Sequence, residues 1–145
     1  AWSGGLPRTG LTPRAAGLNS FLPLLRKGGA EFVSLQYKDD AQEVAQMQRE
    51  HGIRVRRYPW VTQGPDMDLL AGLLGACDEV IGVHTSALHL SSAIGTPTTM
   101  LTHRGSGWRY GPDKLLWYPE TTKTFRKKMG ESWRDCVSRL AEARK

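Results

Sequence analysis

The sequence predicts one α/β domain with a Rossmann-like open parallel sheet and helices on both faces. Three observations predict this fold. Short apolar runs of strand length alternate with helical patterns along the chain. Residues 77–101 read as strand, polar turn, helix and strand, which is a βαβ unit. Polar or glycine-rich segments follow the predicted strands, as they do at the ligand-binding edge of doubly wound sheets.

The central unit begins with a buried strand, which the β-branched run predicts over residues 79–83. His84, Thr85 and Ser86 follow, and a helix is predicted over residues 87–94, before a glycine and a proline that end it. The turn between strand and helix lies at a carboxyl end of the predicted sheet. Doubly wound sheets bind their ligands at such turns.

The start of this helix is a candidate anion site. The first amides of a helix have no partner within it and carry positive partial charge. The hydroxyls of Thr85 and Ser86 and the amide of Ala87 add donors there, and helical spacing puts His89 and Ser92 on the same polar face. The alternative is that Thr85 or Ser86 only caps the helix and that His89 is a surface histidine. The face expected to pack on the core carries Ala87, Leu90 and Ile94.

The other elements follow from the same periodicities and from turn residues. Residues 1–3 are expected to be the end of a strand that begins further upstream, because the chain opens abruptly and without a methionine. The remaining predictions are a loop at 4–17, helix 18–26, strand 31–36, helix 40–51, strand 53–57, loop 58–65, helix 66–76, strand 98–102, loop 103–112, a strand or turn at 115–118, strand 121–125 and helix 132–143. Alternation in the strand over 53–57 puts Val55 inward and Arg56 outward, and Ser132 with Asp135 predicts a capping box at the start of the last helix.

The loop after residues 1–3 contains Gly4, Gly5 and two arginines, of which Arg14 is a candidate phosphate ligand. Glycines let a backbone approach a phosphate, and an arginine binds one with two hydrogen bonds. The segment has no Walker pattern, so the glycine pair alone is a weak signal.

Three more candidates stand at strand ends. Gln36 and Lys38 follow the strand over 31–36, and Arg109 lies in the loop after the strand over 98–102. The alternative for the first two is a strand end that emerges into solvent. Because right-handed crossovers bring these loops to one edge of the sheet, their convergence predicts a phosphate-bearing ligand, in particular a nucleotide.

Asp66-Met67-Asp68 matches the DxD pattern with which one class of glycosyltransferases holds a divalent metal. The pair stands at the predicted start of a helix, where carboxylates cap the first amides and complement the dipole. We therefore interpret it as a helix cap and predict no metal site.

Charge and composition narrow the function further. Residues 104–145 hold eleven basic and five acidic side chains, whereas residues 1–103 hold nine of each. This basic third favours an acidic acceptor or a membrane surface, although a solvated basic helix face is the alternative. No nucleic-acid-binding motif is present. Cys77 and Cys136 lack metal-like spacing, and reduced thiols in the cytoplasm are favoured over an isolated disulfide.

Five sequence segments carry a resemblance to a known family. They are WSG (2–4), FVSLQ (32–36), CDEVIGVHTSALHLSSAIGTPT (77–98), GWRYG (107–111) and LWYP (116–119). In these segments the chain is similar to the C-terminal domain of GT-B glycosyltransferases, in particular those found behind tetratricopeptide repeats and related to bacterial heptosyltransferases. The resemblance implies that residues 1–145 are one half of a GT-B fold, the nucleotide-sugar-binding half, and that an N-terminal acceptor domain belongs to the same protein.

The resemblance also implies roles for single residues. Thr85, Ser86 and the amide of Ala87 would bind the diphosphate, and His89 would lie near the ribose or distal phosphate. Most relatives have Asp where this chain has His84, and the distant O-linked N-acetylglucosamine transferases have His-Thr-Thr there. His84 is therefore the catalytic candidate, because an imidazole can assist the departure of the diphosphate. Arg14, Gln36, Lys38, Gly4, Gly5 and Arg109 complete the predicted nucleotide site.

The expected activity is metal-independent glycosyl transfer from a UDP- or ADP-linked sugar, without any other cofactor. The isolated domain is expected to bind nucleotide and to transfer sugar poorly, because the general base of GT-B enzymes usually belongs to the other domain. Two alternatives stay open. One is a nucleotide-binding or interaction module without catalysis, supported by His84 in place of Asp. The other is a nucleotide-sugar epimerase, for which His84, His89 and His103 are the acid–base candidates.

Overall fold

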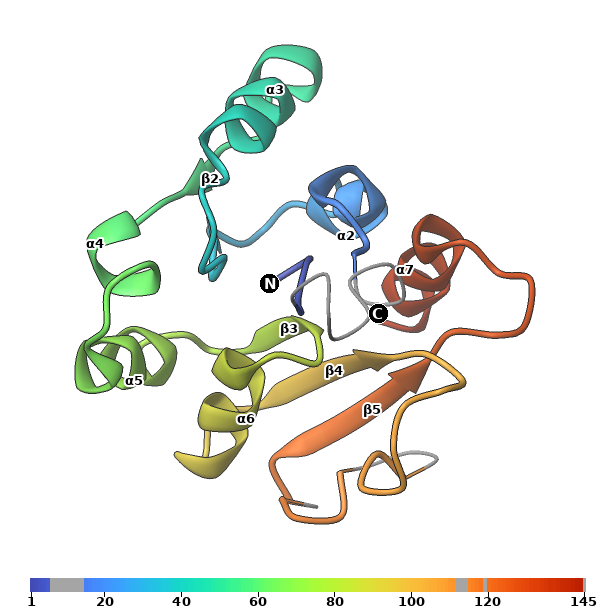
Figure 1. Cartoon of the computed structure of the whole chain (residues 1–145). Coiled ribbons are helices and arrows are strands. Elements are labelled where there is room, and N and C mark those ends of the chain that lie inside the picture. Colours follow the sequence, from blue (N-terminus) through green and yellow to red (C-terminus); the bar gives the residue numbers. More distant parts are fainter. Residues whose placement is uncertain (6–14, 112–114, 119, 145) are drawn as a thin grey trace.

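A computed structural model of the chain describes residues 1–5, 15–111, 115–118 and 120–144 (Figure 1). It has the predicted α/β class, with parallel strands and helices on both faces. The elements are η2 (Leu18–Phe21), α2 (Leu22–Leu25), β1 (Phe32–Val33), α3 (Ala41–His51), β2 (Val55–Arg56), α4 (Pro59–Thr62), α5 (Met67–Gly75), β3 (Val80–Val83), α6 (Ser86–Ala93), β4 (Thr98–Thr102), β5 (Thr122–Arg126) and α7 (Trp133–Ala143).

The strands form two parallel groups, joined by the N-terminal segment Ala1–Ser3. β1 pairs with β2, and β4 lies between β3 and β5. The Ala1 nitrogen donates to the Ile81 carbonyl (3.0 Å) and the Val83 amide donates to the Ala1 carbonyl (3.0 Å), so the segment runs parallel to β3. On its other side, the side-chain carbonyl of Gln36 accepts the amides of Trp2 (3.0 Å) and Ser3 (3.2 Å) just beyond the end of β1.

This arrangement sets the position of the ligand-binding edge. If Ala1–Ser3 is counted as the first strand, the order β2–β1–(1–3)–β3–β4–β5 is the 3-2-1-4-5-6 order of Rossmann folds. The chain reverses its direction of winding between Ala1–Ser3 and β3. The switch point of the sheet is therefore formed by the loops that begin at Gly4 and at His84.

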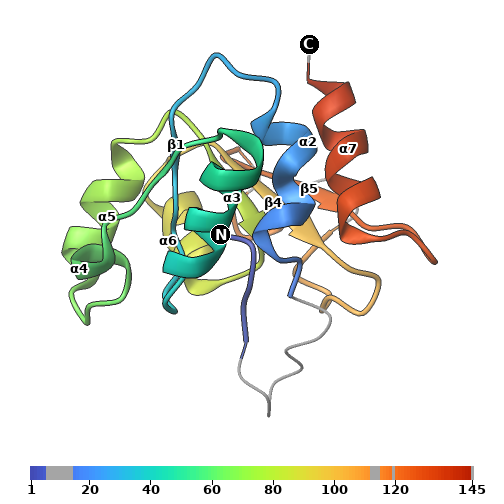
Figure 2. The same cartoon turned by 90° about the horizontal axis from the view of Figure 1, so that it is seen from above.

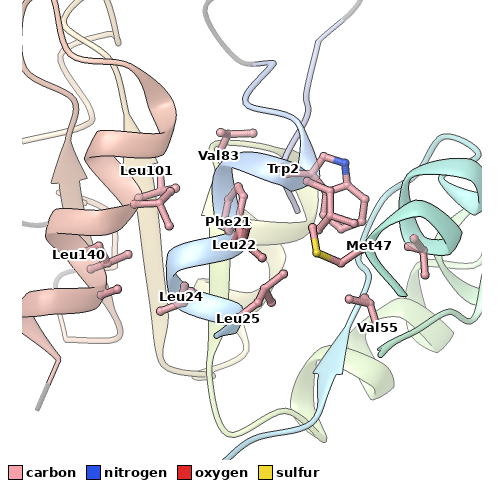
Figure 3. Packing of buried hydrophobic residues seen from close by; sticks show 14 residues of the cluster. Trp2, Phe21, Leu22, Leu24, Leu25, Met47, Val55, Val83, Leu101 and Leu140 are labelled. Atoms are coloured by element: carbon pink, nitrogen blue, oxygen red, sulfur yellow. The ribbon is translucent and has the colours of Figure 1, made fainter. Parts of the chain in front are cut away.

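Helices lie on both faces of the sheet (Figures 1 and 2). Two hydrophobic clusters pack between the helices and the strands. The first joins Val83 and Leu101 of the sheet to η2, α2, α3 and α7, and Trp2 lies within it near Met47 (Figure 3). The second joins Val80 and Met100 to α5 and α6. Because successive strand residues point to opposite faces, the burial of nearly every residue of β3 and β4 shows that both sides of these strands are covered, as expected for a parallel sheet.

Helix caps confirm two predictions. The Asp66 carboxylate accepts the amides of Asp68 (2.9 Å) and Leu69 (3.1 Å), so it caps α5 as predicted. Ser132 and Asp135 form a reciprocal capping box at the start of α7. In β2, Val55 is buried and Arg56 is exposed, which is the predicted alternation.

Other details differ from the predictions. The strand expected over 31–36 is confined to Phe32–Val33, and the loop expected at 58–65 contains α4, which Pro59 starts at its first position. The faces of α6 are also shifted. Ser92, expected on the ligand side, is buried and donates to the Leu88 carbonyl (2.8 Å), whereas Ile94 is exposed. The small hydroxyl side chain of Ser92 can be buried where α6 packs on the sheet, because it hydrogen-bonds to the backbone of its own helix. The periodicity of the sequence does not show this.

Gly82 offers a test of the packing between β3 and the N-terminal segment. A Cβ at Gly82 would overlap the Ala1 carbonyl, whereas a Cβ at Gly72 within α5 would meet no atom within 4 Å. We expect Gly82→Ala to lower the free energy of unfolding by about 3 kcal/mol, since the backbone must shift. Gly72→Ala should raise it by up to about 1 kcal/mol through helix propensity. Urea unfolding of both variants measures the difference, and equal values would contradict the observed contact.

Within the part of the chain that the structure describes, no helix has the length and apolar character needed to cross a bilayer.

Candidate functional site

The carboxyl ends of the parallel strands bring the predicted polar loops to one edge of the sheet. β3 leads into His84, β4 into His103, and the N-terminal segment into Gly4. Gly4 lies directly against the turn after β3, since a Cβ there would come within 2.7 Å of the Thr85 Cγ2. The absence of a side chain at Gly4 allows this close approach of the two loops. Gly4 and Thr85 thus form the two sides of the switch point.

Thr85 is the N-cap of α6, but its hydroxyl does not cap the helix. The residue has extended backbone angles (φ −129°, ψ 170°) and makes no side-chain capping bond. Its Oγ1 is buried without a hydrogen-bond partner among the residues that the structure describes. A buried hydroxyl without a partner is costly, and it marks a place where a bound group would supply one.

The amides at the start of α6 complete an anion-binding geometry. The first intrahelical bonds run from Leu88 (3.1 Å) and His89 (3.2 Å) to the Thr85 carbonyl. The amides of Ser86 and Ala87 precede them and stand at the positive end of the helix dipole. The Ser86 side chain is exposed beside them. The alternative prediction that Thr85 or Ser86 caps the helix is therefore wrong for the side chains.

Histidine and aromatic side chains gather on the β4 side of this turn. The ring of His84 lies 4.9 Å from that of Tyr110 and 5.4 Å from that of His103, measured between centroids. The His89 Nε2 hydrogen-bonds to the Tyr110 hydroxyl (2.9 Å). Tyr110 therefore joins His84, which is 8 % exposed, to His89 on the helix. The alternative that His89 is a surface histidine is wrong, because this side chain is half-buried and hydrogen-bonded to Tyr110.

Burial, together with the nearby Arg109 guanidinium, lowers the pKa of His89. At neutral pH this imidazole is uncharged, so one ring nitrogen is a donor and the other an acceptor. Its Nδ1 is buried without a partner among the described residues, as the Thr85 Oγ1 is. Thr85 Oγ1 and His89 Nδ1 are thus two buried polar atoms, one helical turn apart, without a partner among the described residues.

Arg109 and Trp117 extend the site outward. The Arg109 guanidinium lies 5.5 Å from the ring centroids of both Tyr110 and Trp117. Trp108 is 76 % exposed and meets Trp117 edge to face. The prediction included Arg109 but none of the aromatic residues. Trp108 and Tyr110 stand in the GWRYG segment and Trp117 stands in LWYP. The number of aromatic residues in these two segments is the sequence signal that could have identified them.

The remaining predicted residues divide into three groups. Lys38 donates to the Gly5 carbonyl (3.3 Å), so these two loops do meet at the edge. Gln36 is buried and its carbonyl is used by Trp2 and Ser3, so a role in ligand binding would fall to its amide nitrogen. Arg14 lies outside the described residues.

The arrangement combines amides, hydroxyls, cations and an uncharged imidazole, which is a set of hydrogen-bond donors for an anion. The described residues include no group of three histidine, cysteine or acidic side chains placed to hold a metal ion. Positive charge at this edge comes from the start of α6, Lys38 and Arg109.

Sequence comparison identifies a curated protein that is similar to this chain. The chain is similar to protein FlbA of Caulobacter vibrioides, with 34 % identity over 121 residues. The match covers 83 % of this chain and 20 % of FlbA, so the chain spans about a fifth of the length of that relative. No protein-family profile matches the chain, and no solved structure matches it.

Proposed function

We propose that this domain binds the diphosphate of a nucleotide-sugar at the start of α6 and forms the donor side of a glycosyltransferase. The observation that carries the proposal is the Thr85 hydroxyl, buried without a described partner beside the first amides of α6. A diphosphate oxygen is an acceptor that suits this hydroxyl and these amides together. The resemblance to GT-B donor domains supports the same ligand.

The cations and aromatic rings around the turn suit the rest of a nucleotide-sugar. Lys38 and Arg109 stand on loops at the same edge and add positive charge, and Trp117 offers an exposed ring face to a base or sugar. UDP- and ADP-linked sugars are the donor classes we propose. A metal is not required in this proposal, because protein donors neutralise the diphosphate.

His84 is the proposed catalytic residue. It directly precedes Thr85 and its ring lies 4.9 Å from that of Tyr110, and its imidazole would donate a hydrogen bond to the departing diphosphate. As the bond from the sugar carbon to the phosphate oxygen breaks, the electron pair stays on that oxygen and the sugar passes to an acceptor hydroxyl. The base that takes the acceptor's proton is proposed to come from a second domain, so the isolated domain should bind nucleotide and turn over poorly.

A binding module without catalysis is the second candidate, supported by His84 in the place where most GT-B relatives have Asp. The two candidates share the nucleotide site and differ only in turnover. Sugar transfer by the full-length protein, lost in His84→Ala with nucleotide affinity retained, would support catalysis. If the full-length protein showed neither sugar transfer nor donor hydrolysis, the binding module without catalysis would be favoured.

Calorimetric titration of the domain with UDP, ADP, GDP and TDP tests the site itself. We expect one nucleotide to bind and the variant Thr85→Ala with Ser86→Ala to bind it at least about 10-fold more weakly. Hydrogen bonds to charged groups contribute about 1.5–3 kcal/mol each, which supports this estimate. Thr121→Ala is the matched control, since its hydroxyl donates to the Ser92 carbonyl (2.9 Å) just before β5, at the opposite edge. Binding that is unchanged in the double variant would contradict the proposal.

The location and acceptor are further parts of the proposal. Cys77 and Cys136 are free thiols, which suits a reducing compartment, and we propose the cytoplasm. Several cations of the basic C-terminal third are engaged within the protein, for example Arg139 with Glu131 (3.0 Å) and Arg126 with the Tyr110 carbonyl (2.7 Å). An acidic acceptor or an anionic membrane surface would therefore meet the remaining basic side chains.

A further inference from the structure

The side chain of Tyr110 lies between the turn after β3 and the helix α6. Its ring is buried, with its centroid 4.9 Å from that of His84 and 5.8 Å from that of His89. The backbone of Tyr110 is held on both sides, because its carbonyl accepts the Arg126 guanidinium (2.7 Å) and its amide donates to the Gly107 carbonyl (3.0 Å). These contacts bring the Tyr110 hydroxyl to His89 in a defined position.

The hydrogen bond between the Tyr110 hydroxyl and the His89 Nε2 (2.9 Å) has a preferred direction. Burial, together with the Arg109 guanidinium, lowers the pKa of His89, so at neutral pH only one ring nitrogen carries a hydrogen. A phenol is a better donor than acceptor, and the bare nitrogen of an imidazole is a strong acceptor. We therefore assign the hydroxyl as the donor to Nε2, which puts the hydrogen of the ring on Nδ1.

This tautomer makes the His89 Nδ1 a hydrogen-bond donor near the start of α6. Neither Nδ1 nor the Thr85 Oγ1 has a partner in the described part of the chain, and both atoms are buried. The His89 amide donates to the Thr85 carbonyl (3.2 Å), and side chains at this spacing lie on the same side of a helix. An anion with several oxygens would accept hydrogen bonds from both groups, and bonds to a charged acceptor are the stronger ones.

We propose that Tyr110 is a positioning residue that holds His89 in the Nδ1–H tautomer, so that this N–H and the Thr85 hydroxyl donate together to one phosphate group. Tyr110 acts through His89 and does not contact the ligand. The inference rests on the proposed function for the identity of the anion, and it adds the residue on which the affinity of the uncharged imidazole depends. In the other tautomer, Nδ1 would present a lone pair to the phosphate oxygens and binding would be weaker.

Nitrogen-15 NMR of the 145-residue chain tests the tautomer without any ligand. The His89 signals should be those of a protonated Nδ1 and a bare Nε2. Tyr110→Phe removes only the hydroxyl and should shift the ring toward the Nε2–H form, which predominates in free histidine. Tyr118→Phe is the matched control, because Tyr118 packs against the same hydrophobic cluster, and it should leave the His89 signals unchanged. A wild-type ring in the Nε2–H form, or a Tyr110→Phe ring that stays in the Nδ1–H form, would overturn the proposal.

Titration with pyrophosphate and with UDP, ADP, GDP and TDP tests the effect on binding. At pH 8, Tyr110→Phe should bind pyrophosphate about 3- to 10-fold more weakly than the wild-type chain, which is the range expected for one hydrogen bond. As the pH falls through the pKa of His89, both ring nitrogens become protonated and the difference between the two chains should shrink. Arg109 and His84, which also face Tyr110, are present in both chains, so the ratio of affinities reports on His89. A ratio that is constant with pH would contradict the proposal.

His89→Asn is the background for a double-variant test. The asparagine amide can donate from near the position of Nδ1 without help from Tyr110, so His89→Asn should keep binding pyrophosphate. Adding Tyr110→Phe should then have no further effect, and an effect as large as in the wild-type background would show that the hydroxyl does not act through His89. If neither pyrophosphate nor any nucleotide binds to the wild-type chain, the proposed function fails together with this inference. If they bind, and Tyr110→Phe binds as tightly as Tyr118→Phe, only this inference fails.

Discussion

Replacement of Arg57 by methionine is expected to lower the free energy of unfolding by about 3 kcal/mol. The Arg57 Nε donates to the Asp40 carboxylate (2.5 Å), and the side chain of Asp40 is only 5 % exposed. Asp40 also accepts the Ser34 hydroxyl, while a second nitrogen of Arg57 bonds to Asp39 (2.9 Å). Without its partner, the Asp40 carboxylate would remain buried beside a single hydroxyl, and an uncompensated buried charge is strongly destabilising.

Arg56 is the matched control for this prediction, because it is the adjacent arginine and forms its ion pair in solvent. Its partner Glu31 has a side chain that is 74 % exposed, so Arg56→Met should cost far less stability than Arg57→Met. The double variant Arg57→Met with Asp40→Asn should recover most of the lost stability. Urea unfolding at pH 7 measures all of them, and similar costs for the two single arginine variants would refute the argument.

The buried pair also bears on the site. Asp39 and Asp40 follow Lys38 directly, so their bonds to Arg57 hold the loop that carries this lysine. Under the proposed function, Arg57→Met should therefore weaken nucleotide binding as well as stability, whereas Arg56→Met should leave binding unchanged.

The second large effect is a pH dependence of stability in the 145-residue chain when Ala1 carries a free amine. Burial lowers the pKa of the Ala1 ammonium from 8.0 to about 5. Between these values the unfolded chain binds a proton at this amine that the folded chain does not, so stability falls as the pH falls from 8 to 5. The loss should total about 4 kcal/mol, since each pKa unit corresponds to about 1.4 kcal/mol. Below pH 5 both states are protonated there and the dependence should end.

N-terminal acetylation is the control, because it removes the amine and keeps the amide donor to Ile81. The Cys77 thiol, whose pKa burial raises, faces the amine and stays neutral in this range. His89 has a lowered pKa and adds a slope of the same sign, and that slope persists after acetylation. Urea unfolding from pH 5 to 8 should show most of the dependence in the unmodified chain. Equal slopes before and after acetylation would mean that the amine is not buried.

Local sequence patterns were enough to predict most helices, the parallel strands and two helix caps of this protein. The β-branched runs predicted the strands of the parallel sheet, and alternation in residues 53–57 correctly placed Val55 inward and Arg56 outward. The caps at Asp66 and Ser132 were predicted because they depend on neighbours within three residues. Most importantly, the parallel arrangement predicted from the sequence brings the loops after residue 3, β1, β3 and β4 to one edge.

The hydrogen bonds within the candidate site could not be predicted from the sequence, because they join residues far apart in the chain. Gln36 is joined to Trp2, and His89 to Tyr110, through pairings that no local period contains. The burial of Ser92 and the exposure of Ile94 on α6 follow from how this helix crosses the sheet, which its own sequence pattern does not set.

The sequence by itself therefore determined the fold class, the sheet edge that carries the candidate site and the residues near its centre, because these follow from local periodicity and chain direction. Only the tertiary structure decided which polar atoms are already bonded and which stay without a described partner. These properties depend on register between strands and on packing across the two faces, and both are set by the whole chain at once.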